Sequence, residues 1–287
     1  MATFFDRINS EIHKFIEVRD AEEEVCELYS VYYSTNSKDR LNLVSQTKSE
    51  LEIDIHSGTK PLNITIDQNP NINGELGQTG AVLWNSSVVM SNFFAHCTKE
   101  AWDLTNSNII ELGAGCGLVG ITMHNLGAKR VVLTDQPRMM KLLARNTECN
   151  RVATKPRLLS KKKLGKDSST IDNALLTAEY VWGYPPEDPR ILAEPIDIVI
   201  ASDCVYHEDV AMLLSSTLED MCQSREDVPV VALVGQELRS DLVHQAFVKD
   251  LLDRNFNLYR IPVDPEIDRC HALYMMWLKE THKPTAA

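Results

Sequence analysis

The chain has 287 residues, of which 44% are hydrophobic and 24% charged, and its formal net charge is −12. A chain of this length and composition can bury one sizeable core, so we expect one main domain. The acidic charge disfavours a nucleic-acid partner, which would require a basic face. No apolar run approaches the roughly 20 residues that span a bilayer, so we expect no membrane contact and a cytoplasmic or nuclear location.

The cysteines indicate neither a metal site nor a disulfide framework. The seven of them include no Cys-x-x-Cys pair, and Cys270 and His271 are too close in sequence to share a zinc ion. We therefore expect reduced thiols and no bound metal.

The N-terminal part of the chain predicts an extension to the main domain. Apolar residues recur at helical spacing over residues 4–16, which favours an amphipathic helix. Residues 51–56 and 62–67 alternate polar and apolar side chains on either side of a turn, which predicts a β-hairpin. We divide the chain into an N-terminal extension, residues 1–79, and a main domain, residues 80–287.

The segment 108–135 carries the clearest pattern in the chain. A short apolar run is interrupted by Gly113, Gly115 and Gly117, and an apolar stretch typical of a helix follows. A second β-branched run stops at Asp135, which completes a βαβ unit of the kind that binds an adenosine-bearing cofactor. Asp135 follows Gly113 by 22 residues (135 − 113), close to the roughly 20 at which a carboxylate reaches the ribose hydroxyls.

Two other interpretations of this glycine turn have to be weighed. Residues 115–120 also match the Gly-x-Gly-x-x-Gly pattern of dinucleotide-binding proteins, and a glycine-rich turn can exist without a ligand. Glu111 at the strand end favours S-adenosylmethionine over both, because an acidic group is unfavourable beside a pyrophosphate but favourable beside a cation. S-adenosylmethionine carries two positive groups, an ammonium and a sulfonium. A nicotinamide dehydrogenase is further disfavoured because no second catalytic domain follows the sheet.

The rest of the main domain alternates helices and strands and then ends in a hairpin. We expect helices over 80–94, 136–149, 210–221 and 240–254, and strands over 176–182, 196–201 and 229–234. Two extended runs, 256–263 and 270–279, predict an antiparallel hairpin at the sheet edge. The polar run 161–170 predicts a solvated loop. This order describes a three-layer α/β fold whose sheet is mostly parallel with one reversed strand.

Four motifs occur in order along the main domain, at residues 110–120, 133–135, 180–183 and 203–206. Together they resemble the seven-strand, S-adenosylmethionine-dependent methyltransferases of lysine methyltransferase family 16. The resemblance implies a Rossmann-like, seven-stranded, mostly parallel sheet with an antiparallel C-terminal hairpin. It also implies S-adenosylmethionine as the cofactor.

The motif residues should meet in one crevice, since open α/β sheets bind ligands at the carboxyl ends of their strands. By the resemblance, the residues that contact the cofactor are Trp84, Glu111, Gly113, Ala114, Gly115, Gly117, Asp135, Gln136, Trp182 and Ser202. For the two tryptophans the alternative is ordinary core packing.

Asp203 and Tyr206 are the candidate catalytic residues. The carboxylate would accept an N–H of an incoming lysine amine, and the tyrosine would bound the channel that admits it. The alternative is structural, with Asp203 capping the next helix and Tyr206 packed below it.

These patterns predict a monomeric protein-lysine N-methyltransferase that acts on a non-histone intracellular protein. A translation factor, a ribosomal protein, a chaperone and an ATPase are the substrate classes that the resemblance implies. A small-molecule or protein-histidine methyltransferase is the alternative, because it would share the cofactor half of the site. A cofactor-binding scaffold without turnover is a third hypothesis. Residues 1–79 and 161–170 are suited to selecting a partner protein.

Overall fold

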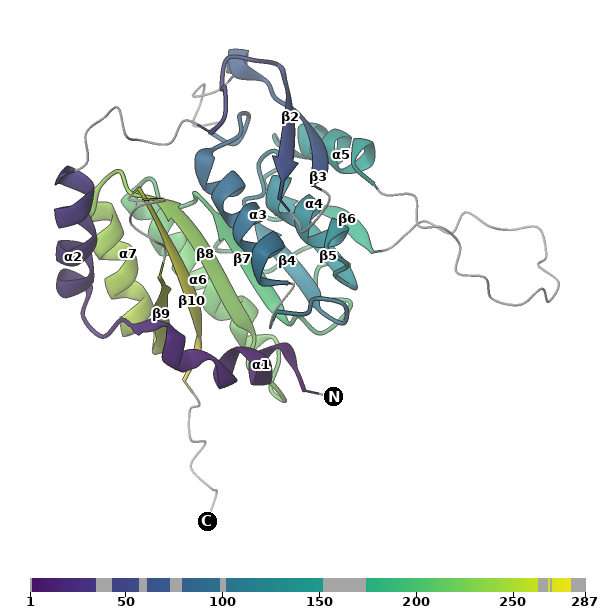
Figure 1. Cartoon of the computed structure of the whole chain (residues 1–287). Coiled ribbons are helices and arrows are strands. Elements are labelled where there is room, and N and C mark those ends of the chain that lie inside the picture. The colour runs from purple at the N-terminus through teal and green to yellow at the C-terminus, as the bar shows by residue number, and fades with distance from the viewer. Residues whose placement is uncertain are drawn as a thin grey trace.

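A mostly parallel sheet forms the centre of the fold (Figure 1). The computed structural model describes residues 2–34, 43–56, 61–72, 79–98, 102–151, 174–262, 268 and 270–279. Within them the sheet has eight strands in the order β1-β9-β10-β8-β7-β4-β5-β6. The strands are β1 (Ile16–Glu17), β4 (Asn108–Leu112), β5 (Arg130–Asp135), β6 (Leu175–Glu179), β7 (Ile198–Ser202), β8 (Val231–Glu237), β9 (Phe256–Ile261) and β10 (His271–Leu278).

The directions of the strands confirm the predicted fold class. Strands β4 to β8 run parallel, and β10 is antiparallel to both of its neighbours, β8 and β9. The C-terminal hairpin, β9 and β10, is therefore present as expected.

The helix expected over residues 4–16 is shorter than predicted, and strand β1 begins at Ile16. Helix α1 (Phe4–Ser10) starts with a capping box at Thr3 and ends after seven residues. A 3-10 turn follows, and β1 then pairs antiparallel with β9. This pairing satisfies backbone groups of β9 that would otherwise form an open sheet edge. A helical pattern in the sequence cannot reveal such a pairing, because its partner lies at the other end of the chain.

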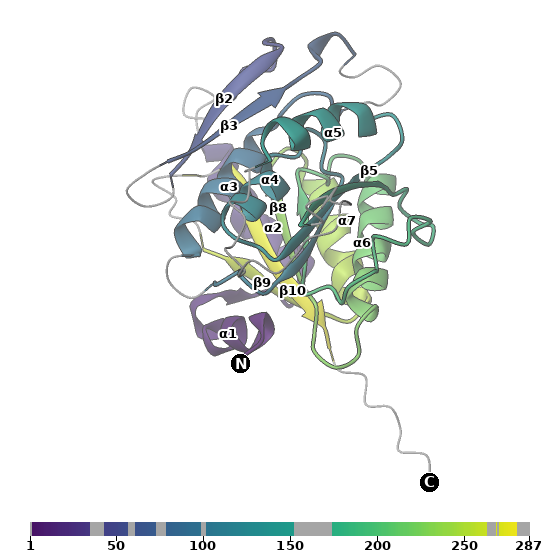
Figure 2. The same ribbon diagram turned by 90° about the vertical axis from the view of Figure 1, so that its right-hand side faces the viewer.

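Helices cover both faces of the sheet. One face carries α1, α3 (Asn85–Cys97), α4 (Leu118–Asn125) and α5 (Met140–Cys149), and the other carries α2 (Ala21–Ser34), α6 (Glu208–Gln223) and α7 (Asp241–Asp253) (Figures 1 and 2). In β4, Ile109 packs in the first of these two cores and Ile110 in the second. The central strands are mainly apolar because both of their faces are buried.

The expected N-terminal hairpin is present and helps to place the turn before α3. Its strands β2 (Glu50–Ile55) and β3 (Leu62–Asp67) lie outside the helices of one face (Figure 2). Beyond β3, the buried Gln68 accepts the N–H of Leu83 at 2.7 Å and so fixes the residue next to Trp84. Apolar residues before and after position 80 share one core. The division of the chain at that position stays a prediction.

Two helices begin later than the sequence predicted. The helix expected from residue 80 starts at Asn85, and an irregular turn precedes it. The helix expected from Gln136 starts at Met140. Pro137 disfavours helical geometry in Gln136, and residues 137–139 form a turn before the helix. The solvated loop expected at 161–170 lies outside the described residues.

None of the helices in the described ranges is long and apolar enough to cross a membrane. In those same ranges, no three His, Cys, Asp or Glu side chains gather into a group that could hold a metal ion. All seven cysteines are free thiols.

A buried chain of polar side chains fixes α2 to the sheet. The hydroxyl of Tyr274 donates to Glu24 Oε1 at 2.8 Å and lies 2.9 Å from Nε2 of His244. Arg260 neutralises Glu24, with Nε at 2.9 Å from Oε1. Burial lowers the pKa of His244 to about 4, so the ring is neutral at physiological pH and its Nε2–H can donate to the tyrosine oxygen.

We predict that Tyr274→Phe destabilises the protein by about 1–3 kcal/mol, because it leaves the buried Glu24 and His244 each without one hydrogen-bond partner. Tyr259→Phe is the matched control, since its ring stacks on Trp277 with a centroid distance of 5.2 Å and keeps that contact. Urea denaturation of both variants measures the difference. Equal stability of the two variants would refute the structural role of the Tyr274 hydroxyl.

Candidate active site

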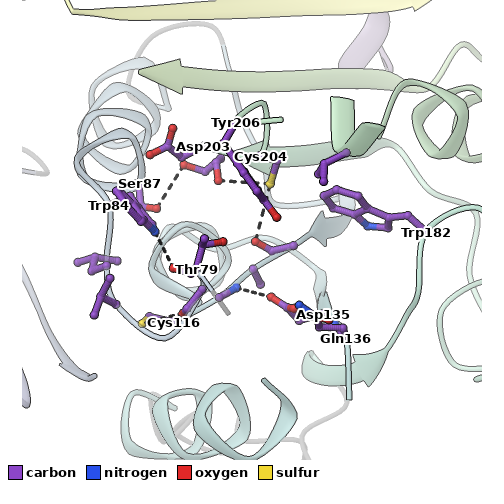
Figure 3. Close-up of a pocket in the computed structure, with 18 of the residues that line it drawn as sticks. Thr79, Trp84, Ser87, Cys116, Asp135, Gln136, Trp182, Asp203, Cys204 and Tyr206 are labelled. Carbon is purple, nitrogen blue, oxygen red and sulfur yellow. Dashed lines mark hydrogen bonds between the residues drawn. The ribbon is translucent and has the colours of Figure 1, made fainter. Parts of the chain in front are cut away.

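A pocket opens at the carboxyl ends of β4, β5 and β7, where the motifs of the sequence were expected to meet (Figure 3). It encloses about 1000 Å³ of space, part of which is open to solvent at its mouth. The lining residues are Thr79, Gly80, Val82, Leu83, Trp84, Ser87, Gly113, Ala114, Gly115, Cys116, Asp135, Gln136, Tyr180, Val181, Trp182, Ser202, Asp203, Cys204, Tyr206, Val210 and Leu213.

The glycine turn between β4 and α4 forms the floor of the pocket. Gly113 has φ +61°, and a Cβ atom there would stand 2.9 Å from the Trp182 ring and 3.0 Å from Sγ of Cys204. Gly115 has φ +55°, and its Cβ would stand 3.1 Å from the carbonyl oxygen of Gly80. Both positions require glycine for conformation and for space. Both glycines line the pocket.

Gly117 belongs to the turn but does not line the pocket. It occupies the N-cap of α4 with φ +84°, and its Cβ would collide with Leu143 at 2.7 Å and Leu133 at 2.9 Å. The glycine is needed for packing of the helix against the sheet. Its expected contact with the cofactor stays a prediction.

Asp135 joins the end of β5 to the glycine turn. Its Oδ2 accepts the N–H of Gly115 at 2.7 Å, and its Oδ1 accepts the N–H of Gln136 at 2.7 Å. A carboxylate oxygen has two lone pairs, so each oxygen keeps one for a further donor such as a ribose hydroxyl. Burial raises the pKa of Asp135 to about 6, against the lowering effect of the two backbone N–H groups. The side chain is ionised at neutral pH.

Glu111 lies beneath the turn and is not one of the lining residues. Its Oε2 accepts the N–H of Gly120 in the first turn of α4 at 2.8 Å. Only glycine fits at that position, because a Cβ would stand 2.5 Å from the carboxylate oxygen. Burial raises the pKa of Glu111 to about 8, and the nearby charge of Asp135 adds to the rise. In the described structure this acid supports the start of α4.

Trp84 and Trp182 line the pocket from opposite sides in the view of Figure 3. Trp84 lies at the N-cap of α3, and its Nε1–H donates to the carbonyl oxygen of Thr79 at 2.8 Å. The Trp182 ring covers Gly113. Both side chains are half-buried. Their expected contact with the cofactor stays a prediction.

Asp203 follows β7 in a left-handed backbone conformation, with φ +57°. Arg239 binds its carboxylate with both ends of the guanidinium, Nη1 to Oδ1 and Nη2 to Oδ2, each at 2.6 Å. Oδ1 also accepts the N–H of Glu237 at 3.4 Å. The helix-capping alternative is not what the structure shows, since His207 caps α6. Tyr206 is 45% exposed at the mouth of the pocket.

The structure brings together most of the residues that the sequence singled out. The residues that line the pocket as expected are Trp84, Gly113, Ala114, Gly115, Asp135, Gln136, Trp182, Ser202, Asp203 and Tyr206, whereas Glu111 and Gly117 lie behind its wall. Sequence reasoning missed the turn at residues 79–83, Cys116, and the apolar residues Val210 and Leu213 of α6. It also missed Arg239, although the motif at 203–206 could have prompted a search for a cation to pair with the acid.

Comparison with known proteins identifies the family to which this chain is similar. A family model described as lysine methyltransferase matches residues 65–251. The chain is 28% identical to mouse protein N-lysine methyltransferase METTL21A, over 66% of this chain and 73% of that protein. It is 26% identical to EEF1A lysine methyltransferase 3 of Xenopus tropicalis, over 77% of this chain and 88% of that protein. It is 29% identical to protein-lysine N-methyltransferase EFM6 of Saccharomyces cerevisiae, over 53% and 58%.

The raised pKa of Glu111 predicts that stability of the cofactor-free protein falls as the pH rises. The folded state holds a proton on this group up to about pH 8, whereas the unfolded chain releases it near the ordinary pKa of 4.5. Ionisation therefore favours unfolding between these two values, by a few kcal/mol in all. Glu111→Gln keeps an acceptor for Gly120 and removes the titration. Thermal unfolding from about pH 5 to about pH 9 should show a shallower decline in the variant, and parallel curves would contradict the assignment.

The contacts of Asp135 predict a pH dependence of ligand binding. S-adenosylhomocysteine carries the ribose without the sulfonium, so its affinity reports on the ribose contact. Its Kd should rise as the pH falls through about 6, because protonation removes the charge that accepts the hydroxyls. Asp135→Ala should bind more weakly by about 1.5–3 kcal/mol. Isothermal titration at several pH values measures both effects, and unchanged affinity in a folded variant would remove the ribose assignment.

Proposed function

The chain belongs to the lysine methyltransferase family, and we propose that its substrate is a lysine side chain of another protein. The observation that carries the proposal is the shape of the site. A glycine turn that lines the pocket is hydrogen-bonded to an ionised Asp135, and the same pocket continues to the partly exposed Tyr206 and Leu213. A cofactor can thus lie on the turn while a separate side chain enters from the mouth.

The cofactor is S-adenosylmethionine, which supplies an activated methyl group when bound. The described residues suit it, because Gly113 and Gly115 line the pocket with backbone and Asp135 has acceptors to spare. We propose that Asp135 holds the ribose hydroxyls and that Trp182 and Val181 cover the base. Trp84 and Ser202 would bound the amino-acid end of the cofactor.

The acceptor nitrogen must be neutral when it attacks, and lysine has a solution pKa of about 10.4. An apolar channel disfavours the ammonium and lowers that pKa. Tyr206, Leu213 and Val181 would provide such surroundings, since each contributes an apolar or aromatic side chain to the lining of the pocket. Asp203 would accept an N–H of the amine and orient it. Positioning of this kind supplies much of the rate of a displacement reaction.

A translation elongation factor is the first substrate to test. One of the relatives is named as a lysine methyltransferase of EEF1A, and the acidic balance of this chain, −12, suits a basic partner. Ribosomal proteins, chaperones and ATPases are the further classes. We propose that the protein works as a monomer in the cytoplasm, without contact to nucleic acid.

We predict that the purified protein adds methyl groups to lysine side chains. The test incubates it with methyl-deuterated S-adenosylmethionine and either recombinant EEF1A or a cell lysate, and mass spectrometry locates the label. Gly113→Ala is the control without activity, because its new methyl group would stand 2.9 Å from the Trp182 ring. Label on histidine or only in the small-molecule fraction would favour the alternative methyltransferases over the lysine enzyme.

A further inference from the structure

Arg239 joins three segments of the chain around the pocket without lining the pocket itself. Its guanidinium binds both carboxylate oxygens of Asp203 at 2.6 Å, after β7. Nη2 also lies 2.7 Å from Glu237 Oε2, at the end of β8. Its Cζ stands 4.8 Å from the ring centre of Trp84, at the start of α3. Two of these partners, Asp203 and Trp84, line the pocket.

The geometry suits arginine rather than any other cation. The fork of the guanidinium matches the two oxygens of a carboxylate, and its flat face stacks on an aromatic ring. The side chain of Asp203 is only 1% exposed, so its charge would be left unpaired in the interior without this partner. Arg239 thus binds the carboxylate through its two Nη atoms and places its Cζ over the indole ring.

The same contacts fix where the carboxylate can accept another donor. An ionised carboxylate offers about four acceptor positions. Oδ1 uses two of them for Arg239 and Glu237, and Oδ2 uses one for Arg239. The remaining position is therefore on Oδ2. The left-handed backbone at Asp203 is held by its N–H, which donates to the carbonyl oxygen of Gly235 at 2.8 Å.

We propose that Arg239 is a positioning residue for methyl transfer, which holds the Oδ2 atom of Asp203 and the indole of Trp84 in one arrangement. This inference rests on the proposed function and adds a residue to it. The arginine couples the acceptor side of the pocket, at Asp203, to the wall at Trp84. Loss of the fork leaves both residues present but no longer aligned with each other.

The test compares Arg239→Gln with Arg225→Gln. Arg225 pairs with Asp197, which precedes β7, so the control removes an Arg–Asp pair from the opposite end of the same strand. The rate of methyl transfer in a single turnover, with saturating S-adenosylmethionine and the protein acceptor found in the lysate, should fall at least tenfold in Arg239→Gln. It should stay within about twofold of wild type in Arg225→Gln. Arg239→Lys, which keeps the charge without the fork, should recover only part of the loss.

The double variant Arg239→Gln with Asp203→Asn separates positioning from stability. It removes both charges, so no unpaired charge remains in the interior and the melting temperature should recover towards that of wild type. The transfer rate should stay low, because the oriented carboxylate is gone. Recovery of both stability and rate in the double variant would overturn the proposal and leave the pair a purely structural one.

A readout independent of activity keeps the two proposals distinguishable. With 5-fluorotryptophan in place of tryptophan, the fluorine NMR signal of Trp84 should shift in Arg239→Gln and stay in place in Arg225→Gln. If wild-type protein labels no protein acceptor, the proposed function fails, and this signal still tests the contact. An unshifted Trp84 signal in Arg239→Gln overturns the inference whether or not the enzyme is active.

Discussion

The hydrogen bond between the Gly115 amide and the Asp135 carboxylate is the contact on which the pocket depends. It joins the turn after β4 to the end of β5 across 2.7 Å, and next to it the Ala114 amide donates to the carbonyl oxygen of Thr134 at 2.9 Å. These two bonds hold the turn against the end of β5, where Gly113, Ala114 and Gly115 line the pocket. The register of the two parallel strands sets the distance, since Glu111 stands opposite Leu133.

The parts of the site that could be predicted without the family resemblance are those in which both partners of a contact lie within one local unit. The glycine turn and Asp135 belong to a single βαβ unit, and its spacing is legible along the chain. The edge strand β1 and the partner of Asp203 are different cases. β1 pairs with a strand near the other end of the chain, and Arg239 comes from the segment after β8. No local pattern marks such contacts.

Glu111 lies at the strand end that the sequence predicted, but its side chain does not point into the pocket. The sequence indicated an acid at the strand end, beside the cofactor. Successive side chains of a strand point to opposite faces, and Ile109, two residues earlier, packs on the face that α4 covers. Glu111 therefore points beneath the helix as well, where its carboxylate accepts the amide of Gly120. The alternation along the strand determines the direction of this side chain, whereas its position at the strand end does not.

The acids around the pocket also show why a cationic cofactor is favoured, for a reason different from the one that the sequence offered. Burial raises the pKa of Glu111 to about 8, so this group is mostly protonated at neutral pH and carries little charge. The charge of Asp203 is matched by Arg239. Asp135 accepts only backbone N–H groups among the bonds described, and with a pKa of about 6 it stays negative at neutral pH. A buried negative charge without a cation at its side attracts hydroxyl donors and positive groups. The charge that a cofactor meets in this pocket therefore comes from Asp135, at the end of β5, rather than from the acid of β4.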